Sequence, residues 1–194
     1  MAGAGGLNVN VRLIGGELAR RQLAEQGKKI DPVIRASLNS TGTKARTERY
    51  INPMRGSIKP ARLRSAMKVK RANTRRMESR IIPSSSGITL LNYNTWGYDA
   101  IDATRARLWV RGPSGRKVAA GFVNPNSAQR LPWDTRSKRA RQNKANAWEH
   151  RRLAMGPSAA YWFKQLSGTQ TIRWVNTYLQ QEFAKRMRKE LRRG

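Results

Sequence analysis

The sequence contains no cysteine among its 194 residues and only one histidine, His150. Without thiols the chain forms no disulfide and offers no thiolate for metal binding or nucleophilic catalysis. No hydrophobic run approaches the roughly 20 residues of a membrane-spanning helix, and the first residues lack the pattern of a signal peptide. We therefore expect a protein of an aqueous, reducing compartment, with no membrane segment and no cofactor.

Acidic residues are also scarce, since 11 Asp and Glu stand against 40 Lys and Arg, a formal net charge of +29. Self-repulsion of this size destabilises a compact state unless a polyanion neutralises it, and nucleic acid is the most common polyanion. The basic residues are distributed along the whole chain, which indicates a charged surface on a folded body. A hydrophobic content of 38%, with six Trp, predicts that this body has a core.

The hydrophobic periodicity predicts an α+β fold in a single domain spanning residues 1–194. Alternation over residues 7–13 indicates a strand, and helices are predicted over residues 17–27 and 31–51. Gly42 lies inside the second helix, where close packing against a sheet would explain it. We expect this helix to end at Asn52-Pro53, because proline cannot continue the hydrogen-bonding pattern.

Residues 61–72 are predicted to form a helical turn that runs into a strand, and further short strands are predicted over residues 77–83 and 87–93. A predicted hairpin over residues 106–123 turns at Gly112–Gly115. Both faces of this hairpin carry apolar side chains, so we expect both to be covered. Residues 169–194 are predicted to form an amphipathic helix. The expected architecture is a small antiparallel sheet packed by the long helix of the N-terminal half and by the C-terminal helix.

Residues 124–157 interrupt this pattern, because they are rich in Arg, Asn, Gln and Ser and contain few apolar side chains. We interpret them as a basic extended excursion, since long irregular segments in compact domains are usually functional or mobile. The candidate nucleic-acid-binding residues are its cations: Arg130, Arg136, Lys138, Arg139, Arg141, Lys144, Arg151 and Arg152. No base-reading motif is visible, so binding is expected to be insensitive to base sequence.

Residues that suit catalysis are few. His150 lies between Glu149 and two arginines, where a solvated or phosphate-contacting role is the simpler interpretation. Asp99 and Asp102 form the only close carboxylate pair that suggests a metal site, and no third ligand is near in sequence. Capping or an ion pair with Arg105 explains them more simply. We therefore predict a protein that is not an enzyme, with no catalytic or metal-binding residue.

Several segments together resemble the minor tail protein Z, or tail-completion, family of long-tailed bacteriophages. These segments are "DPVIRASLNSTGTKARTERYI", "PARLRSAMKVKRA", "SRIIPSSSGITLLNY", "AGFV" and "RWVNTYLQQEFAKRMRKELRR". The similarity extends over most of residues 31–193, whereas the start of the chain and the basic excursion look longer than usual for the family.

The resemblance implies a structural virion protein that completes the head-proximal end of the tail for head–tail joining, after assembly in the host cytoplasm. Its implied partners are the tail terminator, the tail tube and tape-measure or head–tail connector proteins, and the end of the genomic double-stranded DNA. A homohexameric ring would match the symmetry of such tails. Two alternatives stay open: a free-standing DNA- or RNA-binding protein associated with the ribosome or nucleoid, and a nuclease that uses Asp99 and Asp102.

Replacing Arg136, Lys138, Arg139 and Arg141 together with Gln is expected to lower the affinity for duplex DNA while the fold stays intact. The salt dependence should become flatter by roughly 0.9 in log–log slope for each phosphate that the variant no longer neutralises. Fluorescence anisotropy over a salt series measures both quantities. Unchanged binding would assign the excursion to a protein partner instead.

Overall fold

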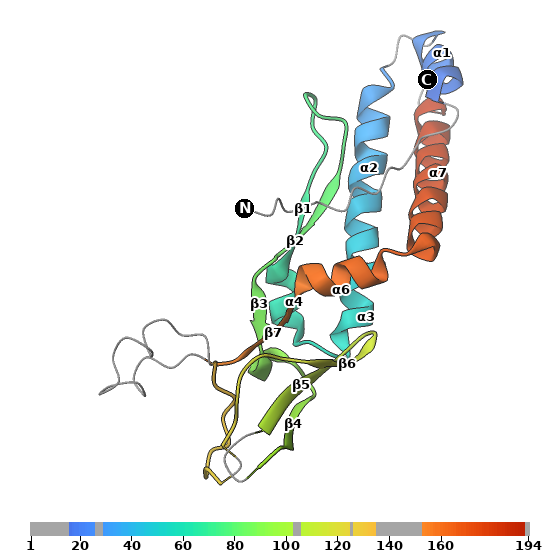
Figure 1. Ribbon diagram of the computed structural model, residues 1–194. Helices are drawn as coiled ribbons and strands as arrows, with labels where there is room; N and C mark the ends of the chain where they lie inside the picture. Colours follow the sequence, from blue (N-terminus) through green and yellow to red (C-terminus); the bar gives the residue numbers. More distant parts are fainter. Residues whose placement is uncertain (1–15, 26–28, 103–105, 125, 135–152, 193–194) are drawn as a thin grey trace, which may run out of the picture. The chain divides into compact units, whose positions relative to one another are not determined.

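The computed structural model describes residues 16–25, 29–102, 106–124, 126–134 and 153–192. Helices and small antiparallel sheets make up these ranges, which confirms the predicted α+β class (Figure 1). The helices are α1 (Gly16–Glu25), α2 (Asp31–Ala45), α3 (Asn52–Arg55), α4 (Pro60–Ala66), α6 (Ala159–Leu166) and α7 (Thr169–Leu191). The strands are β1 (Met67–Lys70), β2 (Arg80–Pro83), β3 (Gly87–Thr89), β4 (Trp96–Ala100), β5 (Ala106–Gly112), β6 (Gly115–Val118) and β7 (Met155–Ser158).

The chain forms two compact units, each assembled from separate stretches of sequence. The described residues of the first unit lie within 16–50, 67–82 and 164–192, and those of the second lie within 51–66 and 83–163. The single domain expected over residues 1–194 stays a prediction. The predicted strand at residues 7–13 lies outside the described residues, and so do residues 125 and 135–152 of the predicted excursion.

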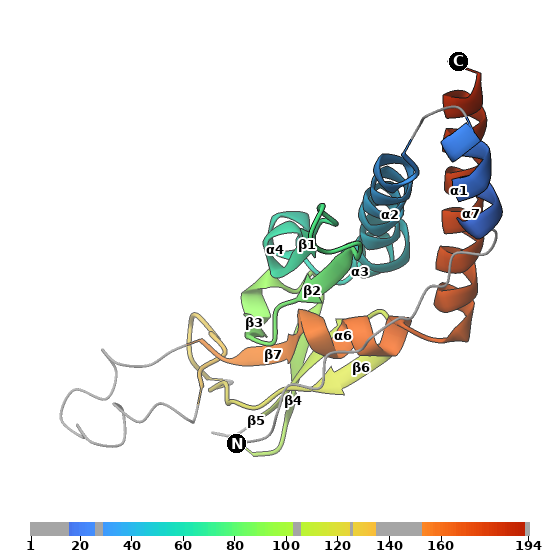
Figure 2. The same cartoon turned by 90° about the horizontal axis from the view of Figure 1, so that it is seen from above.

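The first unit is built on α2 and α7, which lie side by side (Figures 1 and 2). The buried residues of α7 include Leu179, Phe183 and Met187, which repeat every four residues as the predicted apolar stripe requires. Near one end of the pair, Phe183 and Met187 join a hydrophobic cluster with residues from α1 and from the start of α2. Its other buried members are Ala19, Leu23, Ile30 and Val33.

The buried face of α2 is more polar than the sequence suggests. Val33, Ser37, Thr41 and Ala45 repeat every four residues along it. The Ser37 hydroxyl donates to the Val33 carbonyl oxygen at 2.8 Å. The Thr41 hydroxyl is buried and has no hydrogen-bond partner among the described residues. Small side chains at these positions let neighbouring elements approach the helix backbone closely.

The hairpin of β1 and β2 packs against α2 at Gly42. A Cβ atom on Gly42 would lie 2.3 Å from Ser79 Oγ and 3.3 Å from Ser79 Cβ. The first distance is too short for any real Cβ contact, so a larger residue would displace Ser79 or the hairpin. This confirms the explanation from the sequence, that the glycine permits close packing of the helix against a sheet.

The long helix does not end at Asn52-Pro53, so that prediction was wrong. A π-helical segment, Arg46–Ile51, continues α2 into α3, and the helical run stops at Arg55 before Gly56. Pro53 lies in the first turn of α3, a position that proline tolerates because the N–H groups there do not need an intrahelical acceptor. The altered hydrogen bonding of the π-helical segment lets the chain pass the proline.

The second unit contains the antiparallel sheet β4–β5–β6 and the antiparallel pair β3–β7. A hydrogen-bonded chain crosses its core. The buried Trp162 of α6 donates its indole N–H to the Tyr93 hydroxyl oxygen at 3.0 Å, and this hydroxyl donates to the Pro157 carbonyl oxygen at 2.7 Å. Burial raises the pKa of Tyr93 to about 12.

The predicted hairpin over residues 106–123 is present but shorter than expected. β6 pairs with β5 from Gly115 to Val118, while Ala120 and Phe122 form only isolated bridges. The two faces of the hairpin differ, because Val110 is buried whereas Val118 is 60% exposed. Both faces were expected to be covered, but on the outer face cations accompany Trp109 and no described element forms a further layer.

Replacing Tyr93 with Phe is expected to lower the free energy of unfolding by about 1–3 kcal/mol, because the buried indole N–H of Trp162 loses its acceptor. The wild-type phenol has a raised pKa in the folded state, so its contribution is complete below pH 10 and is lost as the pH rises towards about 12. Tyr93→Phe should therefore show a smaller loss of stability over this range. Urea denaturation at several pH values measures both effects.

Tyr161→Phe is the matched control, because its ring under Lys117 is retained and only a hydroxyl is removed. An equal loss of stability in both variants would contradict a specific role for the Tyr93 hydroxyl.

Candidate nucleic-acid interface

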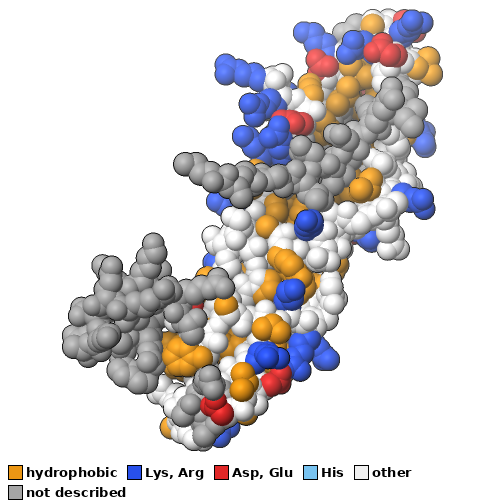
Figure 3. Space-filling model, in the orientation of Figure 1, with side chains coloured by type: hydrophobic (Ala, Val, Ile, Leu, Met, Phe, Trp, Pro, Cys, Tyr) orange, Lys and Arg blue, Asp and Glu red, His pale blue; other side chains and the backbone are white. Residues whose placement is uncertain are grey.

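The β1–β2 hairpin carries a dense group of cations. Residues 68–80 contain six Lys or Arg and a single carboxylate, Glu78. All six cations are exposed: Lys68, Lys70, Arg71, Arg75, Arg76 and Arg80. Glu78 pairs with Arg80 at 2.5 Å. Lys and Arg side chains gather over the hairpin in the space-filling view (Figure 3), so this part of the first unit is strongly positive.

Neutral contacts fix the hairpin against α2. The Asn39 side chain donates to the Ala72 carbonyl oxygen at 3.1 Å and accepts from the Ala72 backbone N–H at 2.7 Å. At the tip, Asn73 Oδ1 accepts from the backbone N–H groups of Arg75 and Arg76 at 3.0 and 2.8 Å. An Asx turn of this kind orders the tip through its backbone. The guanidinium groups of Arg75 and Arg76 play no part in it.

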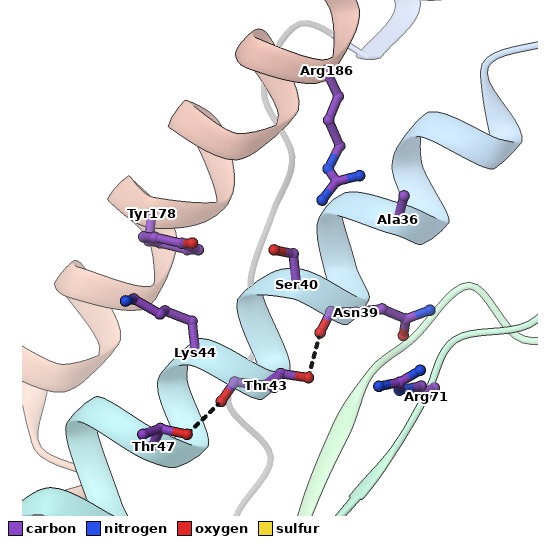
Figure 4. Close-up of a pocket in the computed structure, with 9 residues that line it drawn as sticks. All are labelled: Ala36, Asn39, Ser40, Thr43, Lys44, Thr47, Arg71, Tyr178 and Arg186. Carbon is purple, nitrogen blue, oxygen red and sulfur yellow. Dashed lines mark hydrogen bonds between the residues drawn. The ribbon is translucent and has the colours of Figure 1, made fainter.

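An open cleft of about 430 Å³ lies beside the hairpin in the first unit. Its lining residues are Ala36, Asn39, Ser40, Thr43, Lys44, Thr47, Arg71, Tyr178 and Arg186. Figure 4 shows Tyr178 and Arg186 extending from α7 on one side of α2, and Arg71 on the hairpin at the other side. The cleft therefore has a floor of small residues from α2 and cations on both rims.

The three cations of the cleft differ in how they are neutralised. Lys44 pairs with Glu48 at 2.5 Å, and this hydrogen bond raises the lysine pKa above its ordinary value. Arg186 donates its Nε–H to Glu182 at 2.8 Å. Arg71 forms no ion pair with any described residue. Arg71 is therefore the cleft cation that is best able to bind an added anion.

The hydroxyl groups on the floor contribute less. Thr43 donates to the Asn39 carbonyl oxygen at 2.9 Å, and Thr47 donates to the Thr43 carbonyl oxygen at 3.2 Å. Both protons are thus used within α2, as is common for threonine in helices. Recognition of an anion in the cleft depends on its cationic rims.

An aromatic stack borders the cleft on α7. The rings of Trp174 and Tyr178 lie 5.2 Å apart with an interplanar angle of 10°. The Arg49 guanidinium carbon lies 5.8 Å from the centroid of the Trp174 ring, and its Nη2 donates to the Thr171 hydroxyl at 3.3 Å. These contacts hold the aromatic pair in place beside the cleft.

The structure places only one of the eight candidate residues from the sequence. Arg130 is exposed in the second unit, has a positive φ of 44° and donates its backbone N–H to the Ser127 carbonyl oxygen at 3.2 Å. The other seven, which are Arg136, Lys138, Arg139, Arg141, Lys144, Arg151 and Arg152, lie outside the described residues. Sequence reasoning missed the hairpin, although its density of cations was a visible signal.

The carboxylate considered for a metal site has a protein partner. Asp99 accepts hydrogen bonds from Arg116 and, at 3.2 Å, from the Trp109 indole N–H. The Arg116 hydrogen bond holds the pKa of Asp99 below its usual value. Arg105, the partner suggested from the sequence, lies outside the described residues. Within the described part of the chain, no three His, Asp or Glu side chains gather as a metal site requires.

Asn39→Ala is expected to release the hairpin from α2, because it removes both hydrogen bonds to Ala72. Amide hydrogen exchange at Ala72 should become faster, and stability should fall by about 1–2 kcal/mol. Ser40→Ala is the control, since Ser40 lines the same cleft and forms no described bond to the hairpin. Unchanged exchange at Ala72 in Asn39→Ala would show that the Gly42 contact alone positions the hairpin.

None of the described helices is both long and apolar enough to cross a membrane. The chain matches no family model, no curated protein and no solved structure. The physical character of the cationic hairpin and cleft is therefore the basis for a functional proposal.

Proposed function

We propose that the chain binds the phosphate backbone of nucleic acid without sequence preference, through the β1–β2 hairpin and the adjoining cleft. The observation that carries the proposal is the group of six exposed cations in residues 68–80, which a single carboxylate accompanies. Their mutual repulsion lowers the stability of the free protein, and bound phosphates remove it. Lys and Arg are also the side chains that most often contact phosphates.

The way the hairpin is held supports the same proposal. Asn39 and Gly42 fix its position and Asn73 orders its tip, so the guanidinium groups of Arg71, Arg75 and Arg76 are not needed for folding. Binding then requires little ordering of the backbone, which reduces its entropic cost. Long cations that reach phosphates carry no information about bases, so the affinity should depend weakly on sequence.

The setting we propose follows the family resemblance: a structural protein of a long-tailed bacteriophage virion, at the head-proximal end of the tail. There the chain would form a homohexameric ring with the tail terminator and neighbouring tail or connector proteins, and the genomic DNA would pass its cations. The net charge of +29 on each copy supports a position beside DNA. Electron micrographs of assembled tails with a tagged copy test this setting, and absence from tails favours the free-standing DNA- or RNA-binding alternative.

The triple variant Arg71→Gln, Arg75→Gln, Arg76→Gln is expected to bind duplex DNA more weakly than the wild type. If each arginine contacts one phosphate, the log–log salt slope should fall by about 0.9 for each of them. Anisotropy of labelled duplexes with two unrelated base sequences measures the affinity and its sequence dependence. Both duplexes should lose affinity to the same extent.

A control with the same change in charge is Arg20→Gln, Arg21→Gln, Lys29→Gln, because these exposed residues lie outside the hairpin and do not line the cleft. The control should retain most of the wild-type affinity and salt slope. Equal decreases in affinity in the two variants would show that net charge alone drives binding and that the hairpin is not a site.

A further inference from the structure

The outer face of the β4–β5–β6 sheet in the second unit carries an unusual combination of side chains. Leu108 and Val110 are buried, so the alternation along β5 directs Arg107, Trp109 and Arg111 to the opposite face. The strand register places further residues beside them on that face. These are Gly97 and Val118 opposite Trp109, Asp99 opposite Arg107, and Arg116 opposite Arg111.

Trp109 lies at the centre of this face and is held on three sides. A Cβ atom on Gly97 would lie 2.6 Å from an atom of the Trp109 ring, so the ring passes directly over the glycine. The Arg116 guanidinium carbon lies 4.2 Å from the ring centroid. Asp99 accepts from both Arg116 and the Trp109 indole N–H. The face is therefore preformed, with Val118 exposed beside it.

Two residues of β6, Arg116 and Val118, also present free backbone groups. The Ala119 N–H donates to the Leu108 carbonyl oxygen at 3.0 Å. Hydrogen bonding alternates along an antiparallel pair, so residues 115, 117 and 119 direct their backbone groups to β5. Arg116 and Val118 direct theirs away from it. β6 lies at the edge of its sheet, and no described strand pairs with its outer side.

We propose that the β6 edge binds an extended acidic segment of a partner protein as an added strand. The N–H and C=O groups of Arg116 and Val118 would pair with the backbone of that segment. A carboxylate opposite Arg116 would lie near Arg116 and Arg111, and an apolar side chain two residues along would cover Val118 and the edge of Trp109. Trp and Arg are the residues that contribute most often to the centre of protein interfaces.

The chemistry of the β6 edge favours an acidic protein segment over a second copy of this chain and over nucleic acid. A second copy of β6 would bring Arg116 and Lys117 against like charges, which is a common protection against pairing of equal edges. A nucleic-acid backbone supplies phosphate acceptors for N–H groups but no regular donors for the carbonyl oxygens of Arg116 and Val118. It would also leave Val118 uncovered. A protein strand with carboxylates satisfies all of these groups.

The test uses the full chain and a short fluorescein-labelled peptide with a Glu-Thr-Val-Thr repeat, with anisotropy as the readout. This repeat places glutamate and valine in turn on the same face of a strand. The wild type is expected to bind with a Kd below about 1 mM. Val118→Pro removes an outward N–H without removing a bond to β5, an arrangement that edge strands tolerate. It should weaken peptide binding by about tenfold or more, whereas Val118→Thr, which keeps the N–H, should bind like the wild type.

The same repeat with lysine in place of glutamate should not bind, and circular dichroism should show the same fold for both Val118 variants. The proposal is overturned if the wild type does not bind the acidic peptide, or if Val118→Pro binds it as the wild type does. A loss of duplex DNA affinity in Val118→Pro would also overturn it, by assigning the edge to the nucleic-acid surface. The Arg71, Arg75 and Arg76 triple variant should retain peptide binding, which separates this proposal from the proposed function.

Discussion

The paired hydrogen bonds between the Asn39 side chain and the backbone of Ala72 join the β1–β2 hairpin to α2. They connect neutral groups, so salt does not screen them as it screens contacts between exposed charges. The close approach at Gly42 adds a packing contact that is equally independent of charge. The position of this basic hairpin thus depends on interactions that its own cations neither provide nor disturb.

The two most exposed ion pairs of the first unit contribute little to its stability. The exposed pairs Lys44–Glu48 and Arg80–Glu78 are of the kind that typically contributes about 0–1 kcal/mol. Stability comes instead from the apolar clusters and, in the second unit, from the buried chain of Trp162, Tyr93 and Pro157. Because apolar packing and neutral hydrogen bonds supply most of the stability, the chain can carry a large excess of cations although it has few carboxylates to pair with them.

Helices and strands with regular apolar spacing could be predicted from the sequence, as α7 and the β5–β6 hairpin show. The role of Gly42 was also predictable, because a glycine inside a helix destabilises it unless a neighbouring element needs the space. The continuation of the helix past Pro53 was not predictable, because the π-helical segment depends on local hydrogen bonding that the hydrophobic periodicity does not reveal. The exposure of Val118 depends on the absence of a covering layer among the described residues, which alternation within one hairpin cannot show.

The candidate interface was less predictable than the fold. The cations of residues 68–80 are visible in the sequence. Most of them lie in or beside predicted strands, however, where their spacing is that of ordinary exposed residues. The cleft forms only because α7 lies beside α2, which brings Tyr178 and Arg186 close to residues far earlier in the chain. This proximity results from tertiary packing, and no local sequence pattern predicts it.

The Asx turn at the hairpin tip has a kinetic consequence. Asn73 already accepts hydrogen bonds from the backbone N–H groups of Arg75 and Arg76. These arginines can therefore move from one phosphate of a polyanion to the next by side-chain rotation alone. Those rotations take picoseconds to nanoseconds, far less than the ordering of a loop. A tip of this kind can exchange neighbouring phosphates without local refolding, which would let a bound filament slide past the protein while remaining attached.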